Sequence, residues 1–202
     1  MSLARGVPDA VLDAATACYL RLGVARTTAA DIAKLAGVSR ATLYRRFGTH
    51  EEIFLAVLQR ESEAMARDAA EHLAGIHDPT ERVVIGMLFA IGEIEQRPVH
   101  AALFSSDDAA WAARTAMRGR ALRRIAQDGI QPLVEGAGGA LAAEECADLV
   151  DWILRLLVSY AAVPGHAGMT HDDIRRQLRT LLVPALDRLL ADRADVRRGG
   201  VQ

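Results

Sequence analysis

The chain has 202 residues, of which 51% are hydrophobic and 25% charged, with a formal net charge of −2 at pH 7. This length suits one compact unit, alone or as a module of a larger protein, and the hydrophobic content is ample for a core. The N-terminus lacks a basic region followed by an apolar one, and no run of about 18 apolar residues occurs. We therefore expect neither a signal peptide nor a membrane span, and we expect a cytoplasmic protein.

Charge is divided unevenly along the chain. Residues 1–50 carry seven Lys and Arg against three Asp, a net charge of +4, whereas residues 51–202 carry a net charge of −6. A basic head on an acidic body is typical of a protein whose head binds nucleic acid.

The segment from residue 27 to residue 54 predicts two short helices joined by a tight turn. Thr28 suits the N-cap of the first helix, Gly37 suits the left-handed position that ends it, and Ser39 suits the N-cap of the second. This spacing is typical of a helix-turn-helix unit.

The second of these helices, residues 40–47, has two distinct sides. Leu43 and Phe47 fall together and point at the core, whereas Ala41, Thr42 and Arg45 fall opposite. Arg can bond guanine edges, Thr can bond bases or touch a thymine methyl, and Ala permits close approach. A lone helix of this kind is more often an ordinary solvated face, so the interpretation depends on the helix-turn-helix spacing around it.

The same segment resembles the N-terminal domain of the TetR/AcrR family of one-component transcriptional regulators. The matching residues, which span about the first quarter of the chain, are Gly23, Thr27, Thr28, Asp31, Ile32, Ala33, Ala36, Gly37, Val38, Ser39, Thr42, Leu43, Tyr44, Phe47, Glu52, Ile53 and Phe54.

The resemblance implies which residues contact DNA. Base contacts fall on Arg40, Ala41, Thr42 and Arg45, and phosphate contacts fall on Thr28, Tyr44 and His50. The family usually has His or a Tyr-like residue where Arg46 stands, and often Lys where His50 stands. Arg46 can supply a phosphate contact, while a neutral His50 gives a weaker one at pH 7.

Helical periodicity continues through the rest of the chain, with no convincing period-two segment. Asp78-Pro79 and the Thr170/Asp173 pair are helix starts, Gly136–Gly139 is a loop, and Pro164-Gly165 is a break. The expected helices span about residues 9–22, 28–36, 40–47, 51–73, 79–96, 99–104, 107–135, 142–162 and 170–190. The prediction is an all-α fold of about nine helices. Three of them form a helix-turn-helix DNA-binding domain at 1–50, and a helical ligand-binding and dimerisation domain follows at 51–202.

The last two long helices are apolar around most of their circumference, which favours self-association over the alternative of a central buried helix in one domain. The resemblance implies a four-helix dimer interface there. The candidate interface residues are Leu149, Ile153, Leu156, Leu157, Leu178, Leu182 and Leu186.

Large apolar side chains of the middle region could line a pocket, with Glu93, Arg97 or His100 as polar contacts, although for any one of them a place in the core is the favoured interpretation. The candidates are Met87, Phe89, Ile91, Phe104, Trp111, Met117, Trp152 and Tyr160.

Catalytic signals are weak. The six histidines show no tight metal-ligand spacing, and solvated polar residues explain the grouping of His166 with His171. Cys18 and Cys146 are far apart on apolar-patterned segments, so a disulfide is open but not favoured. We expect no cofactor, no metal and no enzymatic activity.

Our hypothesis is a homodimeric regulator, a repressor that binds a palindromic double-stranded DNA operator and is released by a small apolar or amphipathic effector. The alternative is a helical small-molecule-binding protein or enzyme whose basic N-terminus is incidental. A third interpretation, an architectural protein, would bind DNA with a steep salt dependence and no sequence preference.

Overall fold

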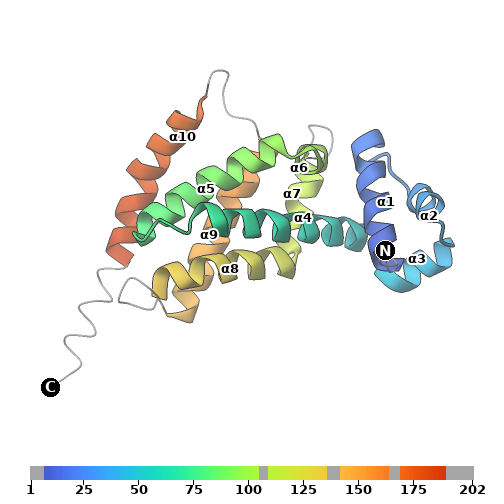
Figure 1. Cartoon of the computed structure of the whole chain (residues 1–202), viewed down its shortest axis with the longest axis horizontal. Coiled ribbons are helices and arrows are strands. Elements are labelled where there is room, and N and C mark those ends of the chain that lie inside the picture. The colour runs from blue at the N-terminus through green and yellow to red at the C-terminus, as the bar shows by residue number, and fades with distance from the viewer. Residues whose placement is uncertain (1–6, 105–108, 136–141, 164–168, 190–202) are drawn as a thin grey trace.

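The computed structural model describes residues 7–104, 109–135, 142–163 and 169–189. These residues form ten α-helices and one π-helical turn and contain no strand, which confirms the all-α prediction. The helices α1–α3 form one end of the molecule, and α4 runs from this end into a body built from α5–α10 (Figure 1). None of the described helices combines the length and apolar character needed to cross a bilayer.

The head helices begin and end where local chemistry predicts. Thr28 accepts a hydrogen bond from the backbone of Asp31, whose carboxylate accepts one in return from the backbone of Thr28. Gly37 ends that helix in the left-handed conformation (φ 68°), and Ser39 caps the next one through the backbone of Thr42. The three elements are α1 (Val7–Leu22), α2 (Ala29–Ala36) and α3 (Arg40–Phe47).

A long helix, α4 (His50–His72), leaves the head and enters the body. Thr49 and Glu52 form a capping box at its start, and Asp78 caps the next helix, whose first residue is Pro79. The remaining helices are α5 (Pro79–Gln96), α6 (Pro98–Leu103), α7 (Ala109–Arg118), α8 (Arg120–Glu135), α9 (Ala143–Ala162) and α10 (His171–Gln177).

The prediction of one continuous helix over 107–135 was wrong, because the chain breaks at Gly119 into α7 and α8. Both helices contact α4. At Gly119 a Cβ atom would lie 3.0 Å from Cδ2 of Leu55, so the backbone between α7 and α8 passes close to α4. The loops predicted at 136–139 and at 164–165 lie outside the described residues.

The last helix continues past Pro184, as predicted. A π-helical turn, η1 (Leu178–Leu182), follows α10, and helix resumes over 183–189. Val183 donates its N–H to the carbonyl of Leu178, five residues earlier. Because proline has no N–H and clashes with the carbonyl four residues before it, a widened turn just ahead of Pro184 lets the helix persist.

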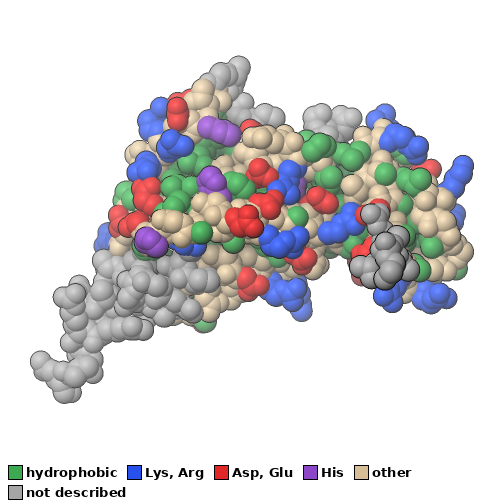
Figure 2. Space-filling view, in the orientation of Figure 1, with side chains coloured by type: hydrophobic (Ala, Val, Ile, Leu, Met, Phe, Trp, Pro, Cys, Tyr) green, Lys and Arg blue, Asp and Glu red, His purple; other side chains and the backbone are tan. Residues whose placement is uncertain are grey.

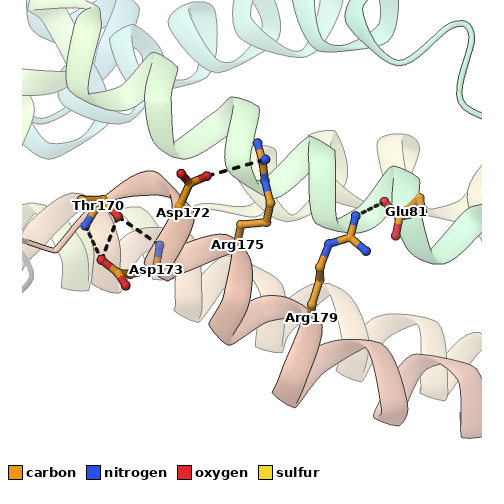
Figure 3. A network of polar contacts seen from close by, with 6 residues as sticks. All are labelled: Glu81, Thr170, Asp172, Asp173, Arg175 and Arg179. Atoms are coloured by element: carbon orange, nitrogen blue, oxygen red, sulfur yellow. Dashed lines mark hydrogen bonds and ion pairs between the residues drawn. The ribbon is translucent and has the colours of Figure 1, made fainter.

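Polar contacts fix the start of α10 and hold it to α5. Thr170 and Asp173 form the predicted capping box, which holds the pKa of the Asp173 carboxyl at about 2. Further along, Nη2 of Arg179 lies 2.7 Å from Oε2 of Glu81 on α5 (Figure 3).

Buried side chains form two apolar clusters. The head cluster joins α1–α3 to the first half of α4 and to α6 and α7, through Leu103, Phe104, Ala112 and Ala116. The body cluster joins α5, α8, α9, α10 and the π-helical turn. The head therefore shares its core with residues of α4, α6 and α7, all of which lie beyond residue 50.

Candidate nucleic-acid interface and effector cavity

Helix α3 presents the two sides that its periodicity predicts. Leu43 is fully buried in the head cluster and Phe47 packs against it half-buried. Around the rest of the helix Thr42 is half-buried, and the exposed side chains are Arg40, Ala41, Tyr44, Arg45 and Arg46. One anchored side and one open polar side are what a groove-reading helix requires.

Basic side chains surround this open side. A hollow of about 410 Å³ lies between α3 and the start of α1, lined by Thr42, Arg45, Arg46, Val7 and Pro8. Lys and Arg side chains lie around the end of the molecule formed by α1–α3, whereas most acidic side chains in this view lie over the body (Figure 2). The structure thus places the predicted positive head at one end of the long axis.

Thr28 is exposed, but its hydroxyl already has a partner. Its Oγ lies 2.6 Å from Oδ2 of Asp31, and bonds from Thr28 lower the pKa of that carboxyl. The hydrogen that a phosphate contact would use therefore points at Asp31. Thr28 fixes the start of α2, and its side chain is not free to donate to DNA.

His50 is held inside the head rather than turned toward solvent. Its ring centroid lies 6.0 Å from that of Tyr19 and 6.5 Å from that of Trp111 on α7. Nε2 is buried without a hydrogen-bond partner, and burial lowers the pKa of the ring. In this structure Nε2 is not exposed for a phosphate contact, and the contact predicted for His50 stays a prediction.

The body contains an apolar cavity of about 180 Å³ between α4, α5, α8 and α9. Six of its 18 lining residues are alanine or glycine on neighbouring turns of α4, α5 and α8, and their small size leaves space between the helices. These residues are Ala66, Ala69, Gly86, Ala90, Ala126 and Gly129. The other lining residues are larger apolar side chains and two polar residues, Ser62 and Arg82.

The predicted pocket residues do not converge on this cavity, and their role in ligand binding stays a prediction. Met87 alone of the eight lines it. Phe89 faces a separate hollow of about 450 Å³ beside α10, where it stacks on His72 with ring centroids 4.9 Å apart.

The other six candidates lie apart from both hollows. Ile91 and Phe104 belong to different apolar clusters, and Trp111 packs against Phe54 with ring centroids 4.8 Å apart. Met117 and Tyr160 pack against the body cluster, while Trp152 is 43% exposed. The large volume of a side chain did not predict that it lines the cavity, because large side chains fill the space between helices. The signal that would have found the cavity is small residues spaced three or four apart.

The suggested polar contacts are also engaged elsewhere. Arg97 pairs with Glu93 and with Asp68, and these pairs raise its pKa. His100 is buried on α6. None of these side chains is among the residues that line the apolar cavity.

Comparisons with known proteins identify the head. Residues 11–57 match the family model described as bacterial regulatory proteins, tetR family, and these residues span the helix-turn-helix and the start of α4. An uncharacterized HTH-type transcriptional regulator of Mycobacterium tuberculosis is 28% identical over 176 residues, which cover 87% of this chain and 83% of that one. The head is a TetR-family DNA-binding domain. The chain is a transcriptional regulator that carries this helix-turn-helix domain at its N-terminus.

Solved structures show that the likeness to TetR-family folds extends beyond the head. The TetR family repressor AlkX from Dietzia sp., implicated in biodegradation of n-alkanes, superposes with a TM-score of 0.67 at 19% identity, covering 94% of this chain and 100% of that one. AibR, solved in complex with isovaleryl coenzyme A and operator DNA, superposes with a TM-score of 0.54 at 15% identity, covering 89% of this chain and 99% of that one.

Most of the predicted dimer-interface side chains are internal to one protomer. Leu149, Ile153, Leu178, Leu182 and Leu186 are buried in the body cluster, and Leu156 and Leu157 pack against it half-buried. The five buried side chains belong to the core of the chain itself, and the dimer interface stays a prediction. The large apolar side chains exposed on the last two helices and at the end of α9 are Trp152, Val163 and Leu181.

Proposed function

We propose that this regulator is a homodimeric repressor that binds a palindromic operator and leaves it when a small effector enters the cavity between α4, α5, α8 and α9. The course of α4 is the observation that carries this proposal. Ile53, Phe54 and Val57 in its first half are buried in the head cluster. Met65 and Ala69 in its second half line the cavity. A ligand that widens the cavity therefore acts on the same rigid helix that carries the head.

The open side of α3 supports the assignment of DNA contacts. Base contacts are assigned to Arg40, Ala41, Thr42 and Arg45, since they lie on or beside the exposed side of α3. Phosphate contacts are assigned to Tyr44 and Arg46 on its flanks. The division into a DNA-binding part at 1–50 and a ligand-binding and dimerisation part at 51–202 stays a prediction, and the core shared with α6 and α7 couples the two parts.

Two heads are needed because one short helix contacts too few base pairs for useful specificity. Helix α9 and the last helix present Trp152 and Leu181 to solvent, 43% and 71% exposed. Large apolar side chains in such positions support pairing with a second copy of the chain through these helices.

A binding role suits the cavity better than a catalytic one. Its polar lining groups are the Ser62 hydroxyl and the Arg82 guanidinium. Neither is a general base, so we expect no catalytic step there.

The test begins with selection of bound sequences from a random DNA pool, followed by a compound screen for release of the selected operator. Ligand affinity is then measured with and without saturating operator. We expect a palindromic site and weaker ligand binding on DNA, by the same factor by which the ligand weakens DNA binding. Binding without sequence preference would contradict the repressor, and a ligand affinity independent of operator would separate the cavity from DNA control.

A further inference from the structure

We propose that the effector of this cavity is a small monocarboxylic acid of about six to eight carbon atoms, whose carboxylate is bound by Arg82. This inference rests on the proposed function, because it names the chemical class of the ligand for the same cavity.

Arg82 is the observation that points to an anion. It lies in the first turn of α5 and lines the cavity, and its Nη1 donates a hydrogen bond to the carbonyl of Ile76 at 2.9 Å. Its Nε is buried and has no hydrogen-bond partner. No carboxylate among the described residues forms an ion pair with this guanidinium. Although the residue as a whole is half-buried, a buried Nε–H without an acceptor is costly, and a carboxylate is the anion whose planar geometry matches a guanidinium.

The rest of the wall restricts the ligand to one polar group. Apart from Arg82 and the buried Ser62, the lining residues are alanine, glycine and larger apolar side chains from α4, α5, α8 and α9. A second charge or a sugar-like ring of hydroxyls would be left without partners there. The complementary molecule therefore has a single anionic head and an otherwise apolar body.

The volume of the cavity limits the size of the apolar part of the ligand. A buried apolar cavity of about 150 Å³ is large enough for benzene, and this cavity measures about 180 Å³. One six-membered ring with a short substituent, or a chain of comparable length, fills it. Gly129 lies exposed at the wall, and a Cβ built on it would meet no atom within 4 Å. That open side gives the ligand a way in.

The hollow beside α10 is larger and is also lined by arginines, but two of these arginines already form ion pairs with acidic residues. Arg179 is paired with Glu81, and Arg175 lies 3.7 Å from Asp172 (Figure 3). Their charges already have partners on the same chain. Arg179 therefore offers a matched control for Arg82: an arginine of the same body whose loss leaves the cavity intact.

The test compares hexanoate with 1-hexanol, which has the same chain without the charge, by isothermal titration of the full-length protein. Wild type, Arg82→Gln and Arg179→Gln are titrated with both. We expect wild type and Arg179→Gln to prefer hexanoate, and Arg82→Gln to bind hexanoate about 10- to 100-fold more weakly. Its affinity for 1-hexanol should change by less than about threefold. Hexadecanoate should bind more weakly than hexanoate, because its chain exceeds the cavity.

Each other outcome is decisive for one of the two proposals. Equal binding of acid and alcohol by wild type, a comparison that needs no variant, would overturn the acid preference and leave the proposed repressor intact. Absence of binding by either compound would overturn this inference. Arg82-dependent binding of hexanoate without any change in operator affinity, with neither this acid nor a screened effector releasing DNA, would support the acid site and contradict the ligand-responsive repressor.

Discussion

Arg45 and Leu43 have different roles on α3. Leu43 anchors the helix to the head, and Arg45 is exposed for contact with DNA. Leu43 is completely buried, so the helix is fixed against the head by a residue that cannot touch a base. Arg45 is exposed on the other side, beside the hollow that also includes Thr42 and Arg46. A fixed backbone with a long cationic side chain is the arrangement from which Arg reads guanine.

Replacing Arg45 with Ala should weaken operator binding by about 1–3 kcal/mol and relax the preference at one base position. Fluorescence anisotropy on the operator and on its single-base variants measures both effects. Arg26→Ala is a suitable control, since Arg26 is a head arginine outside α3 whose Nε donates to the carbonyl of Leu22. Uniform weakening across all DNA sequences would instead make Arg45 a phosphate contact.

The buried environment of His100 makes the stability of the protein depend on pH. Its ring is 2% exposed, and neither ring nitrogen has a hydrogen-bond partner. Burial, aided by Arg97 and opposed by Glu93, lowers its pKa to about 4 from an ordinary value of 6.5. The unfolded chain therefore binds more protons than the folded one between these two values. The free energy of unfolding must fall as the pH falls from about 6.5 to about 4.

Replacing His100 with Leu should raise the free energy of unfolding by about 1–3 kcal/mol, because it removes an unsatisfied buried polar group. The gain should be larger at pH 5 than at pH 7.5, since the variant loses the proton uptake that destabilises the wild type. Urea unfolding at the two pH values checks this. A less stable variant would mean that His100 makes a polar contact that stabilises the fold.

At the scale of elements, helix starts were predictable because their chemistry is local. Thr28, Ser39, Thr49, Asp78 and Thr170 each cap a helix through a backbone N–H three residues later, and each was recognisable in the sequence. The break at Gly119 was not predicted, and a Cβ at this position would meet Leu55 on α4, a neighbour that local sequence patterns do not reveal. The cavity and the buried face of α9 escaped prediction for the same reason. The helix that packs on a given apolar face is determined by the tertiary structure and cannot be inferred from local sequence patterns.

Two glycines, Gly119 between α7 and α8 and Gly129 within α8, should respond oppositely to substitution by alanine. Gly119→Ala should lower the free energy of unfolding by about 1 kcal/mol or more, because its Cβ would press on Leu55. Gly129→Ala should raise it by about 0.5–1 kcal/mol, because a Cβ there meets nothing and alanine favours helix. Thermal and urea unfolding of both variants measure the difference. Stabilisation of both would show that the α4 contact at Gly119 yields easily.

For the whole molecule, α4 and the shared head cluster couple the DNA-binding end to the body. Trp111 on α7 contacts Phe54 on α4 and lies beside His50 at the start of that helix. The head therefore moves with α4 and α7 rather than swinging on a free linker. In a dimer, the separation of two heads follows from how the bodies pair and from the tilt of α4.

The pairing surface can be tested by contrasting exposed with buried positions on the same helices. Trp152→Glu and Leu181→Glu should yield folded monomers with weak operator binding, because each puts a charge into an apolar contact between copies while leaving the protomer core intact. Ile153→Glu and Leu182→Glu should instead unfold the protein, since these side chains are 3% and 1% exposed within one chain. Sedimentation velocity reports the oligomeric state, and circular dichroism reports the fold. Dimers with unchanged operator affinity in both Trp152→Glu and Leu181→Glu would place the interface elsewhere on the body. If Ile153→Glu instead gave folded monomers, Ile153 would be an interface residue, and its burial in the protomer core would be contradicted.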